Sequence, residues 1–256
     1  MRWPTLAAAV AGDDHPCVHS LTDLTEAQGR YLAPFLPRAK RRGRPRTPLR
    51  QVVAAILYVV KAGCQWRLLP PNFPPWQTVY HHFRGWSRAG SLTALNHRLR
   101  AFVRAAVGKR SRPTAAVLDS QTVRSDPHGG TVGYDAGKQT KGRKRCLLVD
   151  TLGLVLGAAV APANTPERAG AQALLEPLLP YFPWVRQHRP KLVVEVIKRT
   201  DALAGLRVLP KRWVVERTLA WLTQQRRLVR DYERSEASAT VWIYVALIRI
   251  MLRRLA

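Results

Sequence analysis

Two acidic residues in a strongly basic chain are the first candidates for chemistry. Asp119 closes a short apolar run, residues 114–119. A carboxylate at the end of a strand can bind a divalent cation, although an aspartate there is also a common turn former. Glu216 lies on an apolar helical segment that is otherwise rich in bases. Its alternative role is an ion pair with Arg212 one turn earlier, worth about 0.3 kcal/mol.

The charge of the chain points to a polyanionic partner. The 256 residues include 42 Lys and Arg but only 16 Asp and Glu, so the net charge is +26, which argues against an ordinary near-neutral metabolic enzyme. Between Glu26 and Asp119 there is no acid, while Lys and Arg occur eighteen times. Nucleic acid fits this segment best, because neutralised phosphates release counterions. An anionic membrane surface is the alternative, but the segment lacks a single basic amphipathic helix.

Other classes of protein are disfavoured by composition. The three cysteines are far apart, which indicates neither a disulfide framework nor a zinc ribbon and favours a reducing compartment. No apolar run reaches the roughly eighteen residues of a membrane span. The apolar fraction of 46% is enough for a folded core.

Apolar periodicity predicts helices first and a mixture of strands and helices later, an α/β fold. We expect a flexible terminus over residues 1–20, a helical DNA-binding domain over 21–108 with a basic arm at 38–50, and a second domain over 114–256. Helices are predicted at 21–36, with Thr22 or Thr25 as its cap, and at 49–62, 76–86, 91–107, 169–179, 211–228 and 237–255. Strands are predicted at 114–119, 145–150, 154–161 and 192–197, with a tight turn at 151–153.

The helices at 49–62 and 76–86, joined by a proline-rich turn and followed by a third helix at 91–107, suggest a helix-turn-helix-like unit. In that arrangement Thr78, His81 and Arg84 face DNA, together with His82 and Arg88, while the aromatic residues between them form core. The basic arm contributes further candidates, which are Arg41, Arg42, Arg44 and Arg46. Arginines beside a glycine can enter a minor groove. We favour the simpler interpretation, a linker that follows the phosphates.

Eight ordered motifs resemble the insertion-sequence transposases of the DDE class, in the small bacterial group with an acid-free helical N-terminal domain. The resemblance extends from about residue 21 to residue 256. The motifs occupy residues 42–46, 56–67, 73–80, 118–122, 133–138, 141–145, 148–153 and 209–217.

This resemblance implies an RNase H-like domain in which two aspartates and a glutamate bind two Mg²⁺ or Mn²⁺ ions for cleavage and joining of phosphodiesters. The first aspartate corresponds to Asp119 and the glutamate to Glu216, with Arg212 as the family's arginine and Asp150 as a structural aspartate. The expected partner is double-stranded DNA, both terminal inverted repeats and target, bound by a homodimer. The expected location is cytoplasmic and nucleoid-associated. Basic residues that would hold the substrate backbone are Lys138, Lys141, Arg143, Lys144 and Arg145.

One departure from the family pattern concerns the second aspartate. In relatives it lies on the strand after the helix at 169–179, in a segment resembling Trp-Ala-Asp-Gly-Gly-Tyr, and this sequence has no such segment. We infer an internal deletion of roughly fifteen to twenty residues at the 183/184 junction, comparable to one strand and a turn. Glu195 is an alternative carboxylate, disfavoured because a glutamate in mid-strand usually faces solvent.

The resemblance with this departure predicts a transposase that lacks one strand and is impaired in cleavage. The alternative is a non-catalytic DNA-binding protein that competes at the element ends.

Overall fold

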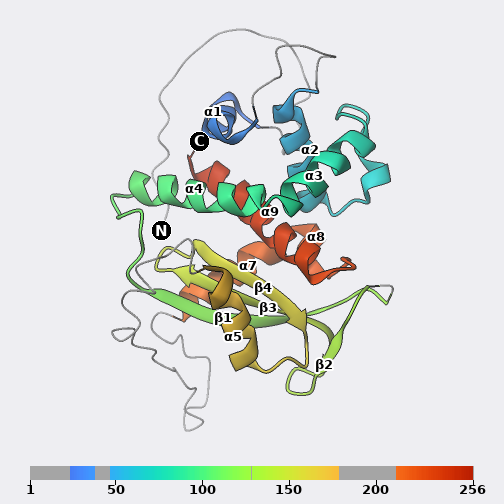
Figure 1. Ribbon diagram of the computed structural model, residues 1–256, viewed down its shortest axis with the longest axis vertical. Helices are drawn as coiled ribbons and strands as arrows, with labels where there is room; N and C mark the ends of the chain where they lie inside the picture. Colours follow the sequence, from blue (N-terminus) through green and yellow to red (C-terminus); the bar gives the residue numbers. More distant parts are fainter. Residues whose placement is uncertain (1–23, 38–46, 128, 179–211, 256) are drawn as a thin grey trace.

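The computed structural model describes residues 24–37, 47–127, 129–178 and 212–255 (Figure 1). Helices come first and a small antiparallel sheet follows, which confirms the expected mixed α/β fold. The elements, with η for 3₁₀-helices, are α1 (Glu26–Leu32), η1 (Ala33–Phe35), α2 (Leu49–Ala62), η2 (Trp66–Leu68), α3 (Trp76–Arg88), α4 (Ser91–Ala106), β1 (Ala116–Arg124), β2 (Gly133–Asp135), β3 (Thr140–Asp150), β4 (Val155–Pro162), α5 (Glu167–Leu175), η3 (Glu176–Leu178), α7 (Trp213–Thr223), α8 (Arg226–Val229) and α9 (Glu236–Leu255).

Local signals explain where the first helices begin and end. The Thr25 hydroxyl accepts a hydrogen bond from the Gln28 amide, and the Gln28 side chain accepts one from the Thr25 amide, so α1 begins with a capping box. Helix α2 has the predicted bounds and ends at Gly63, whose φ of 70° is a left-handed conformation that glycine adopts without strain. These two boundaries follow from short-range chemistry alone.

The sheet is centred on β3. Strand β1 pairs antiparallel along one edge of β3, with Asp119 opposite Leu147, while β4 and the short β2 pair along the other edge. The β3–β4 turn is the predicted one and places Gly153 at a φ of 77°. The prediction that the first strand ends at Asp119 is wrong, because β1 continues to Arg124. Its polar residues remain in the sheet through backbone pairing with β3.

Two other predicted boundaries are corrected. Strand β3 begins at Thr140 rather than at residue 145, again because pairing with β1 and β2 extends it. The helix predicted over 211–228 is two helices within the described residues, since the backbone at Gln225 is extended. This break lets α8 turn and pack against α2.

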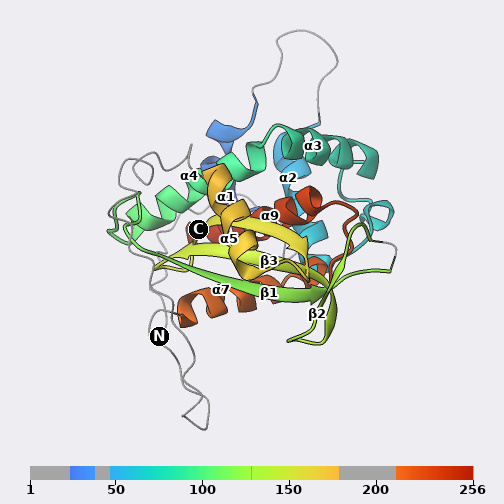
Figure 2. The ribbon, with the colours of Figure 1, turned by 60° about the horizontal axis from the view of Figure 1, so that its bottom comes forward.

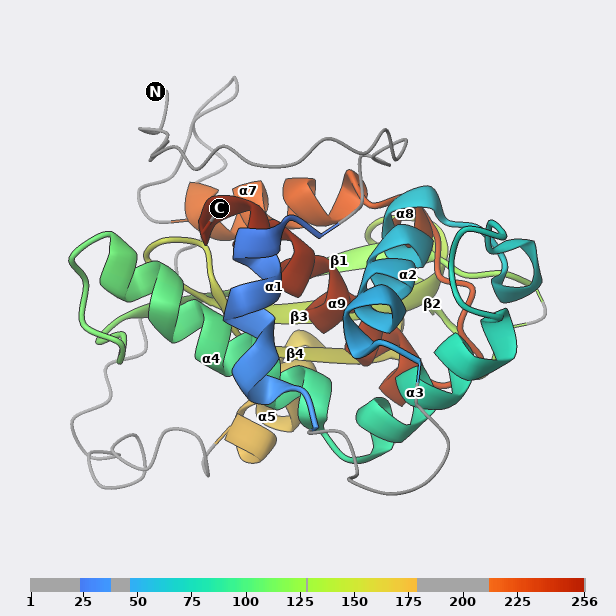
Figure 3. The same cartoon turned by 90° about the horizontal axis from the view of Figure 1, so that it is seen from above.

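Helix α9 connects the two halves of the structure. Figure 3 shows it along one face of the sheet and beneath α1 and α2, while Figure 2 shows α5 crossing the opposite face. Trp242 of α9 is 1% exposed and stacks on Phe83 of α3, with ring centroids 4.6 Å apart. One buried apolar cluster therefore includes side chains from α2, α3, α4, the sheet, α7 and α9.

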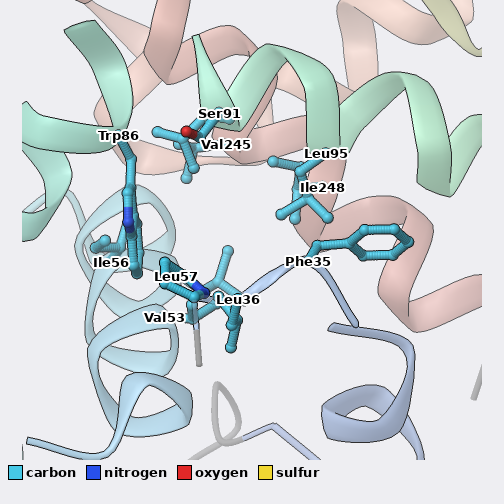
Figure 4. A pocket seen from close by; sticks show the side chains of 12 residues that line it. Phe35, Leu36, Val53, Ile56, Leu57, Trp86, Ser91, Leu95, Val245 and Ile248 are labelled. Carbon is cyan, nitrogen blue, oxygen red and sulfur yellow. The ribbon is translucent and has the colours of Figure 1, made fainter. Parts of the chain in front are cut away.

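A small apolar pocket lies where the chain after α1 meets α2, α4 and α9 (Figure 4). Its volume is about 70 Å³, and Leu36, Ile56, Trp86 and Ile248 are among its walls. Ligand sites generally have volumes of about 300 to 1,000 Å³. The pocket is therefore a packing gap between helices rather than a site for a substrate.

Several predictions fall outside the described residues. They concern the terminus at 1–20, most of the basic arm with Arg41, Arg42, Arg44 and Arg46, the 183/184 junction, the strand at 192–197 and Glu195. In the described part of the chain, no helix is long and apolar enough to cross a membrane. The division into domains at residues 108 and 114 stays a prediction.

Candidate active site and nucleic-acid interface

Asp119 and Glu216 both lie close to one arginine. The Nε atom of Arg212 is 3.9 Å from Oδ2 of Asp119 and 3.3 Å from Oε1 of Glu216. Helix α7 packs against β1 and β3, and this contact brings the two acids together (Figures 1 and 3). The structure thus brings Asp119 to Arg212 and Glu216, which lie almost a hundred residues later in the sequence.

The apolar pattern of α7 determines which way its polar residues point. Val215, Leu219 and Leu222 are buried against the core. Arg212 and Glu216 are one helical turn apart, next to this stripe, and their side chains are 37% and 55% exposed. The Asp119 side chain is 20% exposed, and its Oδ1 accepts a hydrogen bond of 2.8 Å from the Ser120 amide. Oδ2 of Asp119 is therefore the oxygen directed toward α7.

Lys138 and Lys141 are exposed at the β2–β3 hairpin, near the start of β3. The Lys138 ammonium donates to the carbonyl of Ser120, the neighbour of Asp119, at 3.4 Å. The carboxylate of Asp135 accepts hydrogen bonds from the Thr122 hydroxyl and the Lys138 amide, and these two bonds lower its pKa. Both lysines are accessible to a DNA backbone.

The prediction that Arg143 holds substrate is wrong. Its side chain is 1% exposed and pairs with Asp231 at 3.1 Å. It also donates to the carbonyls of Thr131, Glu233 and Arg234. The guanidinium has no surface left for a phosphate, because it ties β3 to the segment that precedes α9.

The prediction that Arg145 and Lys144 hold the substrate backbone is wrong for the same reason, because both side chains are buried. Arg145 is 2% exposed and donates to the Leu228 carbonyl at 2.6 Å, and burial lowers its pKa to about 10. Lys144 is buried on the opposite face of β3, where it donates to the Thr165 carbonyl at 2.9 Å. The two-residue period of a strand could have revealed this, because it places Arg143 and Arg145 on the same face as the apolar Leu147.

Helix α3 presents a different basic surface. His81, Arg84 and Arg88 are exposed, and Arg84 lies over the Tyr80 ring at 5.7 Å. Phe83 is buried, as predicted for this helix, whereas Tyr80 is only half-buried. A shallow hollow on this helix is lined by Trp76, Gln77, Tyr80, His81, Arg84, Gly85 and Arg88. Thr78 is half-buried and is not among the residues that line it.

Asp150 joins the N-terminal helices to the sheet. It is fully buried and forms an ion pair with Arg104 of α4. Its other oxygen accepts hydrogen bonds of 2.9 Å from the amides of Leu152 and Leu154 in the β3–β4 turn. Because every contact is internal, Asp150 serves the fold rather than the candidate active site.

Comparison with protein families identifies the chain. Residues 24–96 match the model of a putative transposase of the IS4/5 family, and residues 110–252 match the transposase DDE domain. The chain belongs to the DDE transposases. No curated protein and no solved structure was found to match it. The expected resemblance to insertion-sequence transposases is thereby confirmed, and the DDE match includes Asp119, Arg212 and Glu216.

DDE transposase domains generally use a divalent metal, and the carboxylates of this transposase fit that requirement only in part. Asp119 and Glu216 offer oxygen ligands within 3.9 Å and 3.3 Å of the Arg212 Nε atom. Two carboxylates suit one hard cation, but a pair of ions needs more shared oxygen ligands. Among the described residues, no group of three acidic, histidine or cysteine side chains could hold a metal ion.

Proposed function

We propose that this transposase binds the double-stranded ends of its insertion sequence and is impaired in cutting them. The observation that carries this proposal is the acid pair Asp119 and Glu216 beside Arg212, without a third ligand among the described residues. The sequence also lacks the segment in which relatives have their second aspartate. One ion could be held by such a pair, whereas the in-line mechanism uses two.

The three site residues have separate roles in this proposal. Asp119 and Glu216 supply the oxygen ligands for Mg²⁺ or Mn²⁺. When bound, such an ion would activate a water or a DNA 3′-hydroxyl as the nucleophile. Arg212 offsets one of the two negative charges of the carboxylates, and its guanidinium suits a phosphate oxygen of the bound strand.

DNA binding rests on the exposed cations of the described structure. His81, Arg84 and Arg88 project from α3, Lys138 reaches the carbonyl of Ser120 beside Asp119, and Lys141 is exposed at the start of β3. The arm residues Arg41, Arg42, Arg44 and Arg46 would add contacts to the phosphates. The proposal also includes target DNA as a second partner, a homodimer on paired element ends and association with the nucleoid.

An end-cleavage assay tests the proposal. A duplex with the terminal inverted repeats is incubated with the protein and Mg²⁺ or Mn²⁺, and binding is followed in parallel by gel mobility shift. We expect salt-dependent binding that prefers the ends, without nicking. Glu176→Ala is the matched control, since Glu176 is an exposed acid outside the site. Efficient nicking that Asp119→Ala abolishes and Glu176→Ala retains would overturn the impaired state.

A second candidate function follows from the same incomplete set of acids. A transposase that binds the ends without cutting them would compete with active copies of the enzyme. Adding this protein to an active relative with the same terminal repeats would then inhibit cleavage in proportion to end occupancy. Binding that ignores the end sequence would rule this function out.

A further inference from the structure

Gly85 is an unusual residue for its position in α3. It lies in the interior of the helix on an exposed face, where glycine is less favourable than alanine. Its φ is not in the left-handed region. A Cβ atom added to Gly85 would meet no atom within 4 Å. Neither the backbone conformation nor packing inside the described structure therefore requires a glycine here.

The surroundings of Gly85 suggest that a bound molecule, rather than the fold, accounts for a glycine at this position. The residue lines the shallow hollow on α3, whose volume is about 440 Å³. Arg84 and Arg88 line the hollow with His81 one turn earlier, and α3 contains no Asp or Glu. Two half-buried rings also line it, those of Trp76 and Tyr80. Arg67 lies over Trp76 at 5.6 Å and adds another positive charge beside the hollow.

These features suit a phosphodiester group rather than a base edge. A glycine lets a ligand approach the helix backbone closely, and it has no side chain with which to read a base. Guanidinium groups bind phosphate with paired hydrogen bonds, and a neighbouring carboxylate would repel the anion. The acid-free hollow provides two exposed guanidinium groups around the one position without a side chain.

We propose that a phosphodiester of the DNA backbone binds on α3 at Gly85, beside Arg84 and Arg88. This inference rests on the proposed DNA binding and names one point of contact for it. A phosphate contact carries no sequence information. Occupation of the hollow therefore strengthens binding to element ends and to unrelated duplexes by the same factor.

The test compares Gly85→Ala and Gly85→Leu with the wild-type full chain by fluorescence anisotropy. The probes are an element-end duplex and a scrambled duplex of the same length. We expect Gly85→Leu to weaken binding to both probes about tenfold and Gly85→Ala to weaken it less, with an unchanged ratio between the probes. The midpoint temperature of thermal unfolding should stay the same or rise by about 1–4 °C, because alanine and leucine both favour a helix more than glycine does.

Two further variants separate the possible outcomes. Ala173→Leu adds the same side chain to an exposed position of α5, away from the hollow, and should leave binding unchanged. If Arg84→Ala weakens binding while both Gly85 variants bind like wild type, the seat at Gly85 is wrong and DNA binding stands. If a Gly85 variant changes the ratio of the affinities for the element-end and scrambled duplexes, the contact is not to a phosphate. If wild-type protein shows no preference for element ends, the proposed function itself fails.

Discussion

Helix α3 and strand β3 both have arginines in close succession, but these arginines have opposite surroundings. On α3, Arg84 and Arg88 are exposed beside a shallow hollow. On β3, Arg143 and Arg145 are 1% and 2% exposed and donate to internal oxygens. The first pair is available to DNA, whereas the second holds the C-terminal segment against the sheet.

The difference shows that an arginine can be structural even in a strongly basic chain. Arg143 is paired with the equally buried Asp231, so its charge is compensated within the fold. A buried pair costs desolvation energy, and removal of one partner leaves the other charge unpaired. Exposed arginines have no such desolvation cost in the folded protein, because water solvates their guanidinium groups. Loss of an arginine on β3 should therefore lower the stability of the fold, whereas loss of an arginine on α3 should lower the affinity for DNA.

The largest effect is expected for Arg143→Ala. Loss of the guanidinium leaves the Asp231 carboxylate and three backbone carbonyls without their donor, so the free energy of unfolding should fall by about 3–5 kcal/mol. Urea denaturation measures this change. Arg84→Ala is the matched control and should alter stability by less than about 0.5 kcal/mol. Equal stability of the two variants would remove the distinction between the regions.

A second large effect concerns pH and the interior of α4. His97 is 7% exposed, and burial, with a smaller contribution from Arg100, lowers its pKa to about 4 from the ordinary 6.5. The unfolded chain therefore binds a proton that the folded chain excludes. Stability should fall as the pH decreases from about 6.5 to about 4, by about 3 kcal/mol in total.

Denaturant unfolding of wild type and His97→Gln across this pH range checks that dependence. The variant should lose the part of the slope that belongs to His97, whatever its stability at neutral pH. If the two slopes coincide, the buried histidine is not the group that titrates.

A smaller effect, confined to binding, is expected on α3. Arg84→Ala and Arg88→Ala should each weaken DNA binding about three- to tenfold and reduce the slope of log affinity against log salt by about 1. Mobility shifts at several salt concentrations measure both quantities. Unfolding should be unaffected, in contrast to Arg143→Ala. An unchanged salt slope in both variants would mean that α3 does not contact phosphates.

The smallest effect on stability is expected for Asp119→Asn. The Asp119–Arg212 contact is 3.9 Å long and partly exposed, so its loss should change the unfolding free energy by less than about 1 kcal/mol. Mn²⁺ binding, followed by electron paramagnetic resonance, should nevertheless weaken at least about tenfold. Glu176→Gln is the control that should retain it. Equal Mn²⁺ affinity of the two variants would place the ion elsewhere.

The amino-acid sequence by itself determined the features that depend on neighbouring residues. The bounds of α2, the glycine at its end and the turn at Gly153 follow from local periodicity and backbone preference, and the sequence limited the cap of α1 to Thr22 or Thr25, of which the structure has Thr25. The acid-free segment up to Asp119 indicated a polyanionic partner, and the ordered motifs indicated the transposase family, which the family matches confirm.

The tertiary structure decided what depends on distant partners. Strand β1 extends to Arg124 because β3 supplies its hydrogen-bond partners, whatever the polarity of its side chains. Arg143 is interior because Asp231 and carbonyls near the start of α9 surround it. Asp119 and Glu216 share Arg212 because α7 packs on β1. A local pattern specifies a side chain's type and helical or strand face, whereas its burial and partners depend on segments far away in the chain.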